Sequence, residues 1–278
     1  MSYKTILVHL NDERRARHIL APAVALARNF GAHLIGLHVF PAYHLTPPIS
    51  FPVGANLIGN IRQQIQDETD RIRAAFELQT ANELFSAEWR SITTDRVEPA
   101  TVVRTHVRAA DLIVASQADP KWDFSSILDF PERIALEGGR PVFVVPNGDW
   151  TPRVPPRNIT IGWNGRREAA RAIFDALPFL KQAEHVHVLT VEDGDEQQHG
   201  LPDTALADAL GRHGVKATIS KVKPATSAPE EVRERALAHQ SELLVLGAYG
   251  HSRFREFAFG GVTRHILRTM TIPVLFSH

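Results

Sequence analysis

The two halves of this 278-residue chain repeat one another in order, and this repeat constrains the fold more than any other feature. Residues 4–8 (KTILV) correspond to residues 157–161 (RNITI), and residues 111–114 (DLIV) correspond to residues 242–245 (ELLV). Near the end of each half, GRPVF corresponds in the same way to TIPVL. A repeat of this length indicates duplication of a whole domain, because the units of solenoid proteins are much shorter.

Each half alternates short apolar runs with longer stretches whose apolar residues recur at helical spacing. Strands are expected in the first half at residues 5–10, 33–40, 85–92, 111–116 and 141–145. In the second half they are expected at residues 158–163, 186–191, 217–222, 243–246 and 273–276. One helix is expected to run from Ala169 to Leu180. Strands that alternate with helices predict an α/β fold, here two tandem five-stranded parallel-sheet domains with helices on both faces.

A proline-rich stretch (PNGDWTPRVPPR) separates the two halves. We therefore divide the chain into a domain at residues 1–147, a linker at residues 148–157 and a second domain at residues 158–278. The last strand of each half is apolar, and an exposed apolar edge strand tends to pair with another strand. Two such strands on one chain have a high effective concentration. We expect the domains to pair through them in a pseudo-two-fold arrangement, a pseudo-dimer within one chain.

The end of the second half has the pattern of a strand, a glycine-rich loop, a helix and a final strand. The glycines of this segment are Gly247, Gly250, Gly260 and Gly261. Glycine lets backbone N–H groups approach a ligand because it has no Cβ. A helix that starts at Gly261 directs free N–H groups and its positive dipole end at the loop. The segment therefore predicts a cradle for an anion, and we expect nucleotide phosphates there; the alternative is a strand-to-helix turn with no ligand.

The spacing of these residues, G-x2-G-x9-G-G-V, resembles the nucleotide loop of the universal stress protein family, whose usual form is G-x2-G-x9-G-[S/T]. Gly247, Gly250, Gly260 and Val262 match, whereas Gly261 stands where ATP-binding members carry a hydroxyl residue. Together with the repeat, the resemblance covers nearly the whole chain and implies a tandem universal stress protein. It implies a Rossmann-like fold, similar to that of adenine nucleotide α-hydrolases, and a stress-response protein that binds ATP or another adenine nucleotide.

Ligands of open parallel sheets bind beyond the carboxyl ends of the strands. In the second half these ends carry Trp163, Asn164 and Gly165 after the first strand and Val191 at the end of the second. The resemblance places Asn164 where family members usually carry an Asp that contacts the adenine side, so the base preference is open. Trp163 either stacks on a ring or packs at the sheet end.

Further candidates lie in or just after the glycine-rich loop. His251 and Arg253 either meet phosphate or are solvated loop residues. Thr263 either supplies the hydroxyl that Gly261 lacks or lies on the surface of the helix. The candidate nucleotide-binding residues are therefore Trp163, Asn164, Gly165, Val191, Gly247, Gly250, His251, Arg253, Gly260, Gly261, Val262 and Thr263.

The first half lacks this loop. Ser116 and Asp119 stand where the second half has its first two glycines, and Asp119 adds a negative charge where phosphate would lie. Trp122 and Phe124 occupy part of the loop, and Gly138–Gly139 follows the predicted helix instead of preceding it. We predict that the first half has lost the phosphate cradle; the alternative is a shifted loop that still works.

Composition narrows the possible partners. Acidic and basic residues balance at 31 each, so charge gives no reason to expect nucleic acid or anionic membrane as a partner. The chain has no cysteine, which excludes disulfides and thiol chemistry.

His185 and His187 share a strand face, but no third ligand is recognisable, so no metal site is expected. No signal peptide or membrane-length apolar run is visible, and a cytoplasmic protein is expected.

Three functions remain open at this stage. The sequence contains no G-x4-G-K-[S/T], no G-x-S-x-G and no H-E-x-x-H motif, so no catalytic residue is assigned. The first hypothesis is a binding or regulatory module in which the adenine nucleotide biases a conformation or a surface for an unidentified protein partner. The second is a slow ATPase, with Mg2+ supplied alongside ATP. The third is a stress-linked scaffold with a vestigial nucleotide site. A further homodimer of the pseudo-dimer is also open.

Overall fold

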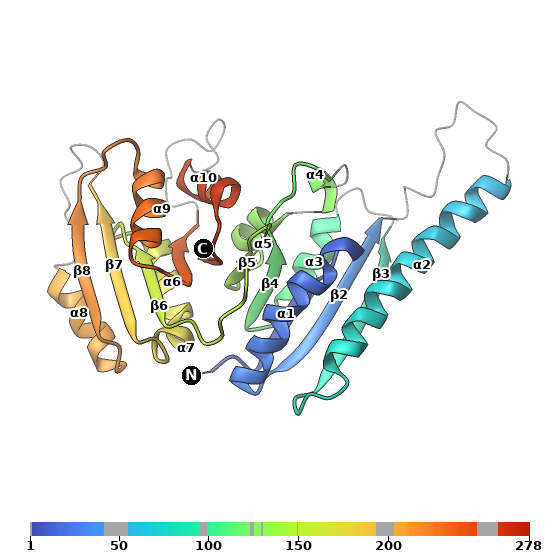
Figure 1. Ribbon diagram of the computed structural model, residues 1–278, viewed down its shortest axis with the longest axis horizontal. Helices are drawn as coiled ribbons and strands as arrows, with labels where there is room; N and C mark the ends of the chain where they lie inside the picture. Colours follow the sequence, from blue (N-terminus) through green and yellow to red (C-terminus); the bar gives the residue numbers. More distant parts are fainter. Residues whose placement is uncertain are drawn as a thin grey trace.

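The computed structural model describes residues 2–41, 55–94, 99–122, 125–128, 130–148, 150–192, 203–248 and 261–278 (Figure 1). The first half contains the strands β1 (Thr5–His9), β2 (His33–Pro41), β3 (Ala87–Thr94), β4 (Leu112–Ser116) and β5 (Val142–Val145). Its helices are α1 (Glu13–Phe30), α2 (Ala55–Thr80), α3 (Pro99–Val107), α4 (Ser125–Leu128) and α5 (Pro131–Glu137).

The second half repeats this order of elements. Its strands are β6 (Asn158–Gly162), β7 (His185–Val191), β8 (Ala217–Val222), β9 (Leu243–Gly247) and β10 (Val274–Ser277). Its helices are α6 (Arg167–Asp175), α7 (Leu177–Leu180), α8 (Asp203–Arg212), α9 (Ala228–Ala238) and α10 (Gly261–Thr269). Figure 1 shows the first half, blue to green, beside the second, yellow to red.

The described strands form one ten-stranded sheet in the order β3-β2-β1-β4-β5-β10-β9-β6-β7-β8. Neighbouring strands are parallel within each half. Each half therefore has five parallel strands in the same order, and the two sets meet at β5 and β10. This confirms the predicted α/β fold of two tandem five-stranded parallel sheets.

The sheets of the two halves meet in an antiparallel pairing of equivalent strands. Val142, Phe143 and Val144 of β5 pair with Phe276, Leu275 and Val274 of β10, in that order. The register is self-complementary, because Phe143 and Leu275 are equivalent in the repeat and pair with each other. Such a pairing is what a two-fold axis between two similar units requires. The predicted pseudo-two-fold arrangement through the last strands is confirmed.

Helices cover both faces of the sheet, and the strands are apolar on both sides for this reason. On β1, Ile6 and Val8 belong to the core under α1, α2, α6, α7 and α8, whereas Leu7 belongs to the core under α3, α5, α9 and α10. This alternation follows from the two-residue period of a strand. None of the described helices is both long enough and apolar enough to cross a membrane.

One predicted element is divided in the structure. The sequence predicted a single helix from Ala169 to Leu180, but α6 ends at Asp175 and α7 begins at Leu177. Pro178 has no N–H with which to continue the hydrogen-bond ladder, so it fits only in the first turn of a new helix. The spacing of the apolar residues alone does not indicate this break.

Two buried histidines lie near the carboxyl end of the first-half sheet. The pKa of His9 is lowered to about 3. Burial is the main cause, and the neighbouring His38 and Arg15 contribute to the same shift. Burial also lowers the pKa of His38, although its Nδ1 donates a hydrogen bond of 2.7 Å to the Leu10 carbonyl. Both rings are therefore held neutral inside the folded protein.

Replacing Phe276 by Ala tests the junction between the halves. Phe276 is fully buried and pairs with Val142 on one side and Leu246 on the other. The substitution should lower the free energy of unfolding by about 3–5 kcal/mol, because it empties a large volume where both halves meet. Urea unfolding measures this, and the exposed Leu84→Ala is the control, which should change little. A loss below about 1 kcal/mol for Phe276→Ala would contradict the packing described.

The buried His9 predicts a loss of stability in acid. Below about pH 6.5 the unfolded chain gains a proton on this side chain. The folded chain excludes that proton until the pH approaches about 3. The free energy of unfolding should therefore fall as the pH falls through this window. Protonation of His9 in the unfolded chain contributes up to about 1.4 kcal/mol per pH unit to this fall. Urea unfolding at pH 7, 6 and 5 should show a shallower fall for His9→Leu than for the wild type; equal slopes would contradict the assignment.

Candidate functional site

The candidate residues of the second half gather at the carboxyl edge of its sheet. Gly162, the last residue of β6, pairs with Leu189 of β7 and with Leu246 of β9. The loop after β6 and the end of β9 are therefore neighbours. This is the edge at which open parallel sheets bind their ligands.

The loop after β6 is a tight turn that leads into α6. Trp163 is half-buried against the core, and its backbone N–H donates to the Leu189 carbonyl at 2.8 Å. Asn164 is exposed, and its Oδ1 accepts from the Arg166 N–H at 3.1 Å. Gly165 has φ of 70°, a left-handed conformation that favours glycine. The packed position of Trp163 matches one of its two predicted roles, while the exposed Asn164 remains accessible to a ligand.

Gly247 is needed for packing, whether or not a ligand binds. A Cβ at this position would lie 2.5 Å from the Ala169 nitrogen and 2.5 Å from the Glu168 carbonyl carbon, both on α6. The end of β9 thus lies directly against the first turn of α6, and only glycine allows this approach. The sequence attributed this glycine to phosphate binding alone and missed its packing role.

The helix after the glycine-rich loop begins where the sequence predicted, at Gly261. Gly261 is exposed, has no left-handed φ, and has open space where a Cβ would be. The first turn of α10 carries no acidic residue, so the positive end of its dipole is not offset from within the helix. Val262 is half-buried. Thr263 is buried, so the alternative that placed it on the helix surface is wrong.

The other predicted site residues fall into two groups. Val191, at the end of β7, is half-buried against the core on the α9 and α10 face. Four candidates lie outside the residues that the structure describes: Gly250, His251, Arg253 and Gly260.

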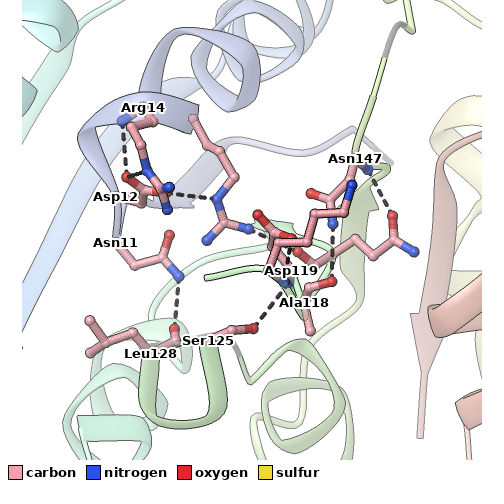
Figure 2. Close-up of polar contacts among 11 residues, drawn as sticks. Asn11, Asp12, Arg14, Ala118, Asp119, Ser125, Leu128 and Asn147 are labelled. Atoms are coloured by element: carbon pink, nitrogen blue, oxygen red, sulfur yellow. Dashed lines mark hydrogen bonds and ion pairs between the residues drawn. The ribbon is translucent and has the colours of Figure 1, made fainter. Parts of the chain in front are cut away.

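The corresponding edge of the first half is closed by a charged cluster (Figure 2). Asp12 is buried and accepts from the Arg14 N–H at 2.9 Å, which caps the start of α1. The guanidinium groups of Arg14 and Arg15 also bind its carboxylate, at 2.9 Å and 3.1 Å. Burial raises the pKa of the Asp12 carboxyl, but the Arg14 hydrogen bonds and the Arg15 charge outweigh it and hold the pKa below its ordinary value. The carboxylate is thus a resident anion at the start of α1.

The same cluster reaches the end of β4. Arg15 Nη1 donates to the Gln117 carbonyl at 3.1 Å, and the Arg15 guanidinium lies 4.8 Å from the centre of the Trp122 ring. This distance is within the range of a cation–π contact. The Asp119 N–H donates to Ser125 Oγ at 3.0 Å. These contacts favour the prediction that the first half has lost its phosphate cradle; Phe124 lies outside the described residues.

Sequence reasoning missed the residues that close the first half. When β1 is aligned with β6, Asp12 corresponds to Gly165 and Arg15 corresponds to Glu168. A carboxylate replaces a glycine and a cation replaces an anion, so a position-by-position comparison of the repeats could have found both. Glu168 is buried beside Gly247 and forms an ion pair with Arg167 at 2.5 Å.

The predicted histidine pair does not form a metal site among the described residues. His187 stacks on His239 with 4.1 Å between ring centres, whereas His185 is exposed. Burial lowers the pKa of both His187 and His239. No group of three or more side chains suited to a metal is found within the described ranges.

Comparisons with known proteins agree with this architecture. Residues 156–278 match the model of the universal stress protein family. The universal stress protein Slr1230 of Synechocystis is 29% identical over 91 residues, and that match covers 32% of this chain and 31% of the relative. The sequence match therefore spans less than a third of the relative's length.

Solved structures extend the likeness to the whole chain at the level of fold. A universal stress protein from Archaeoglobus fulgidus has a TM-score of 0.66 at 13% identity, covering 98% of this chain and 95% of that one. A functionally unknown protein from Pseudomonas aeruginosa has a TM-score of 0.58 at 14% identity, covering 99% and 92%. Residues 156–278 match the universal stress protein family by sequence, and the whole chain has the fold of a solved universal stress protein.

Proposed function

We propose that the second half binds an adenine nucleotide at the carboxyl ends of β6, β7 and β9, and that the chain acts as a binding or regulatory module in a stress response. The observation that carries this proposal is the difference between the two sheet edges. Residues 11–15 and 117–125 of the first half include an internal carboxylate, two bound arginines and a stacked indole. The second half has glycine at the position of that carboxylate and again at the start of α10.

The start of α10 supports phosphate binding. The first four N–H groups of a helix have no partner within it, and they attract anions together with the dipole. Gly261 adds no side chain over these groups, and no acidic residue in the first turn repels a phosphate. The sequence before this helix contains further glycines and, at positions 251 and 253, a histidine and an arginine.

The loop after β6 supports binding of the base. The exposed Asn164 offers an amide that both donates and accepts, which suits an adenine edge. Trp163 and Val191 present half-buried apolar surface near the same edge. Because the amide of Asn164 carries no charge, it distinguishes between bases by hydrogen bonding alone. We therefore expect a weaker preference for one base than an aspartate would give.

Mass spectrometry of the small molecules released on denaturation tests the proposed function. An adenine nucleotide should leave the purified protein, at no more than one per chain. Where none is retained, calorimetry with AMP, ADP and ATP should still show binding. No retained nucleotide and no binding would overturn the proposal and favour a scaffold. Phosphate release from ATP with Mg2+ would identify a slow hydrolase instead of a binding module.

Two substitutions at equivalent positions test which half binds. Gly250→Asp should abolish nucleotide binding, because it adds a carboxylate and a side chain where the phosphates are proposed to lie. Asp119→Asn is the matched variant in the first half and should change affinity little. Calorimetry with AMP compares both variants with the wild type. Equal losses would mean that the assignment to the second half is wrong.

Gly261→Ser tests the missing hydroxyl. A hydrogen bond to a charged group contributes roughly 1.5–3 kcal/mol, which is about a tenfold to hundredfold change in affinity. The wild type should therefore bind ATP weakly, with little gain over AMP or ADP, and the serine should strengthen ATP binding more than AMP binding. The open space and ordinary φ at Gly261 mean that the side chain fits. Wild-type binding of ATP at nanomolar strength, far above AMP, would contradict this reasoning.

A further inference from the structure

The side chain of Gln117 joins the two halves through a buried hydrogen bond. Gln117 follows β4 in the first half and is 6% exposed. Its Nε2 donates to the Leu267 carbonyl of α10 at 2.8 Å, across 150 residues of sequence. Its Oε1 accepts from the Asn147 N–H at 2.7 Å. The amide thus uses both its ends, one within its own half and one in the other half.

The carbonyl that Gln117 reaches is one that α10 cannot satisfy by itself. The last four carbonyl groups of an α-helix have no partner within the helix. Leu267 is among them, because α10 ends at Thr269, and the residue is buried. A buried carbonyl without a partner is costly, so the donor from Gln117 acts as a C-terminal cap on α10 that the first half supplies.

Gln117 is also held from the other side by the charged cluster of the first half. Its backbone carbonyl accepts from Arg15, which binds Asp12 and stacks on Trp122. A continuous chain of contacts therefore runs from the closed edge of the first half to the helix that borders the glycine-rich loop of the second. Ala248, the residue that corresponds to Gln117 in the repeat, has no side-chain donor, so it cannot make the reciprocal contact.

We propose that Gln117 is a positioning residue through which the first half holds α10, and with it the proposed nucleotide site, in place. The closed edge of the first half then has a function of its own: it is a fixed support for the second. The effect on nucleotide affinity rests on the proposed function, whereas the effect on α10 itself does not. By linkage, a nucleotide that orders the start of α10 also strengthens the contact with Gln117.

Hydrogen exchange of the full chain without ligand tests the contact directly. Gln117→Met keeps a similar shape but removes both hydrogen bonds, so amides of α10 should exchange roughly fivefold to hundredfold faster. Asn147→Ala is the matched control, because it removes only the bond from Asn147 Nδ2 to the Ala118 carbonyl and leaves the Gln117 contacts intact. Unchanged exchange in α10, or the same acceleration in every helix, would overturn the proposal.

A second variant separates the contact between the halves from the local one. In Gln117→Glu at pH 8 the carboxylate still accepts from the Asn147 N–H but cannot donate to the Leu267 carbonyl. It should loosen α10 as Gln117→Met does, and it carries the test if the Met variant does not fold. Protection of α10 equal to that of the wild type in this variant would contradict the role of the Leu267 contact.

Calorimetry with AMP then connects the contact to the site. Both Gln117 variants should bind AMP at least fivefold more weakly than the wild type, whereas Asn147→Ala should bind it equally well. Unchanged AMP affinity in a variant whose α10 exchanges faster would overturn the link to the site. Failure of the wild type to bind AMP would instead overturn the proposed function, and hydrogen exchange would still decide whether Gln117 holds α10.

Discussion

The antiparallel pairing of β5 with β10 is the contact on which the rest of the structure depends. It joins two five-stranded sheets into one and pairs the backbone edges of β5 and β10, which would otherwise be open. It also brings α10 of the second half next to the end of β4 in the first, where Gln117 meets the Leu267 carbonyl. The carboxyl edges of the two sheets are therefore linked to each other by direct contacts.

Within this common frame, a few side chains make the two edges chemically different. Asp12, Arg15 and Gln117 of the first half correspond to Gly165, Glu168 and Ala248 of the second. The first set forms a network of ion pairs and hydrogen bonds that supplies its own anion to the start of α1. The second set is a glycine in a tight turn, a buried glutamate paired with Arg167 and a buried alanine. The two halves thus share one backbone arrangement, and the roles proposed for them, a support and a binding site, rest on these few side chains.

The sequence predicted the fold closely because its main signals are local. The apolar run at residues 6–8 is buried on both faces, as a central parallel strand requires, and Gly261 marks the first residue of α10. The pairing of the last strands could be predicted because both are apolar and would otherwise be open edges. Pro178 marks the break between α6 and α7 in the sequence, because proline fits only the first turn of a helix, whereas the apolar spacing continues across it.

What the sequence could not predict depends on residues that are distant along the chain. The need for glycine at position 247 comes from the approach of α6, about eighty positions earlier, and not from any motif. The burial of Thr263 depends on the elements against which α10 packs. The Gln117–Leu267 hydrogen bond joins residues whose proximity only the assembled sheet determines. The repeat and the glycine spacing suggested where to look for a site, but not these contacts around it.

We propose that the two halves share one fold but differ in function, so that only the second takes a nucleotide. A crystal structure of the full chain grown with AMP tests this most directly. We expect one nucleotide per chain, with its phosphate at the start of α10, its base near Asn164, and the Asp12–Arg15–Trp122 cluster unchanged. A nucleotide in the first half, either alone or together with one in the second, would contradict it.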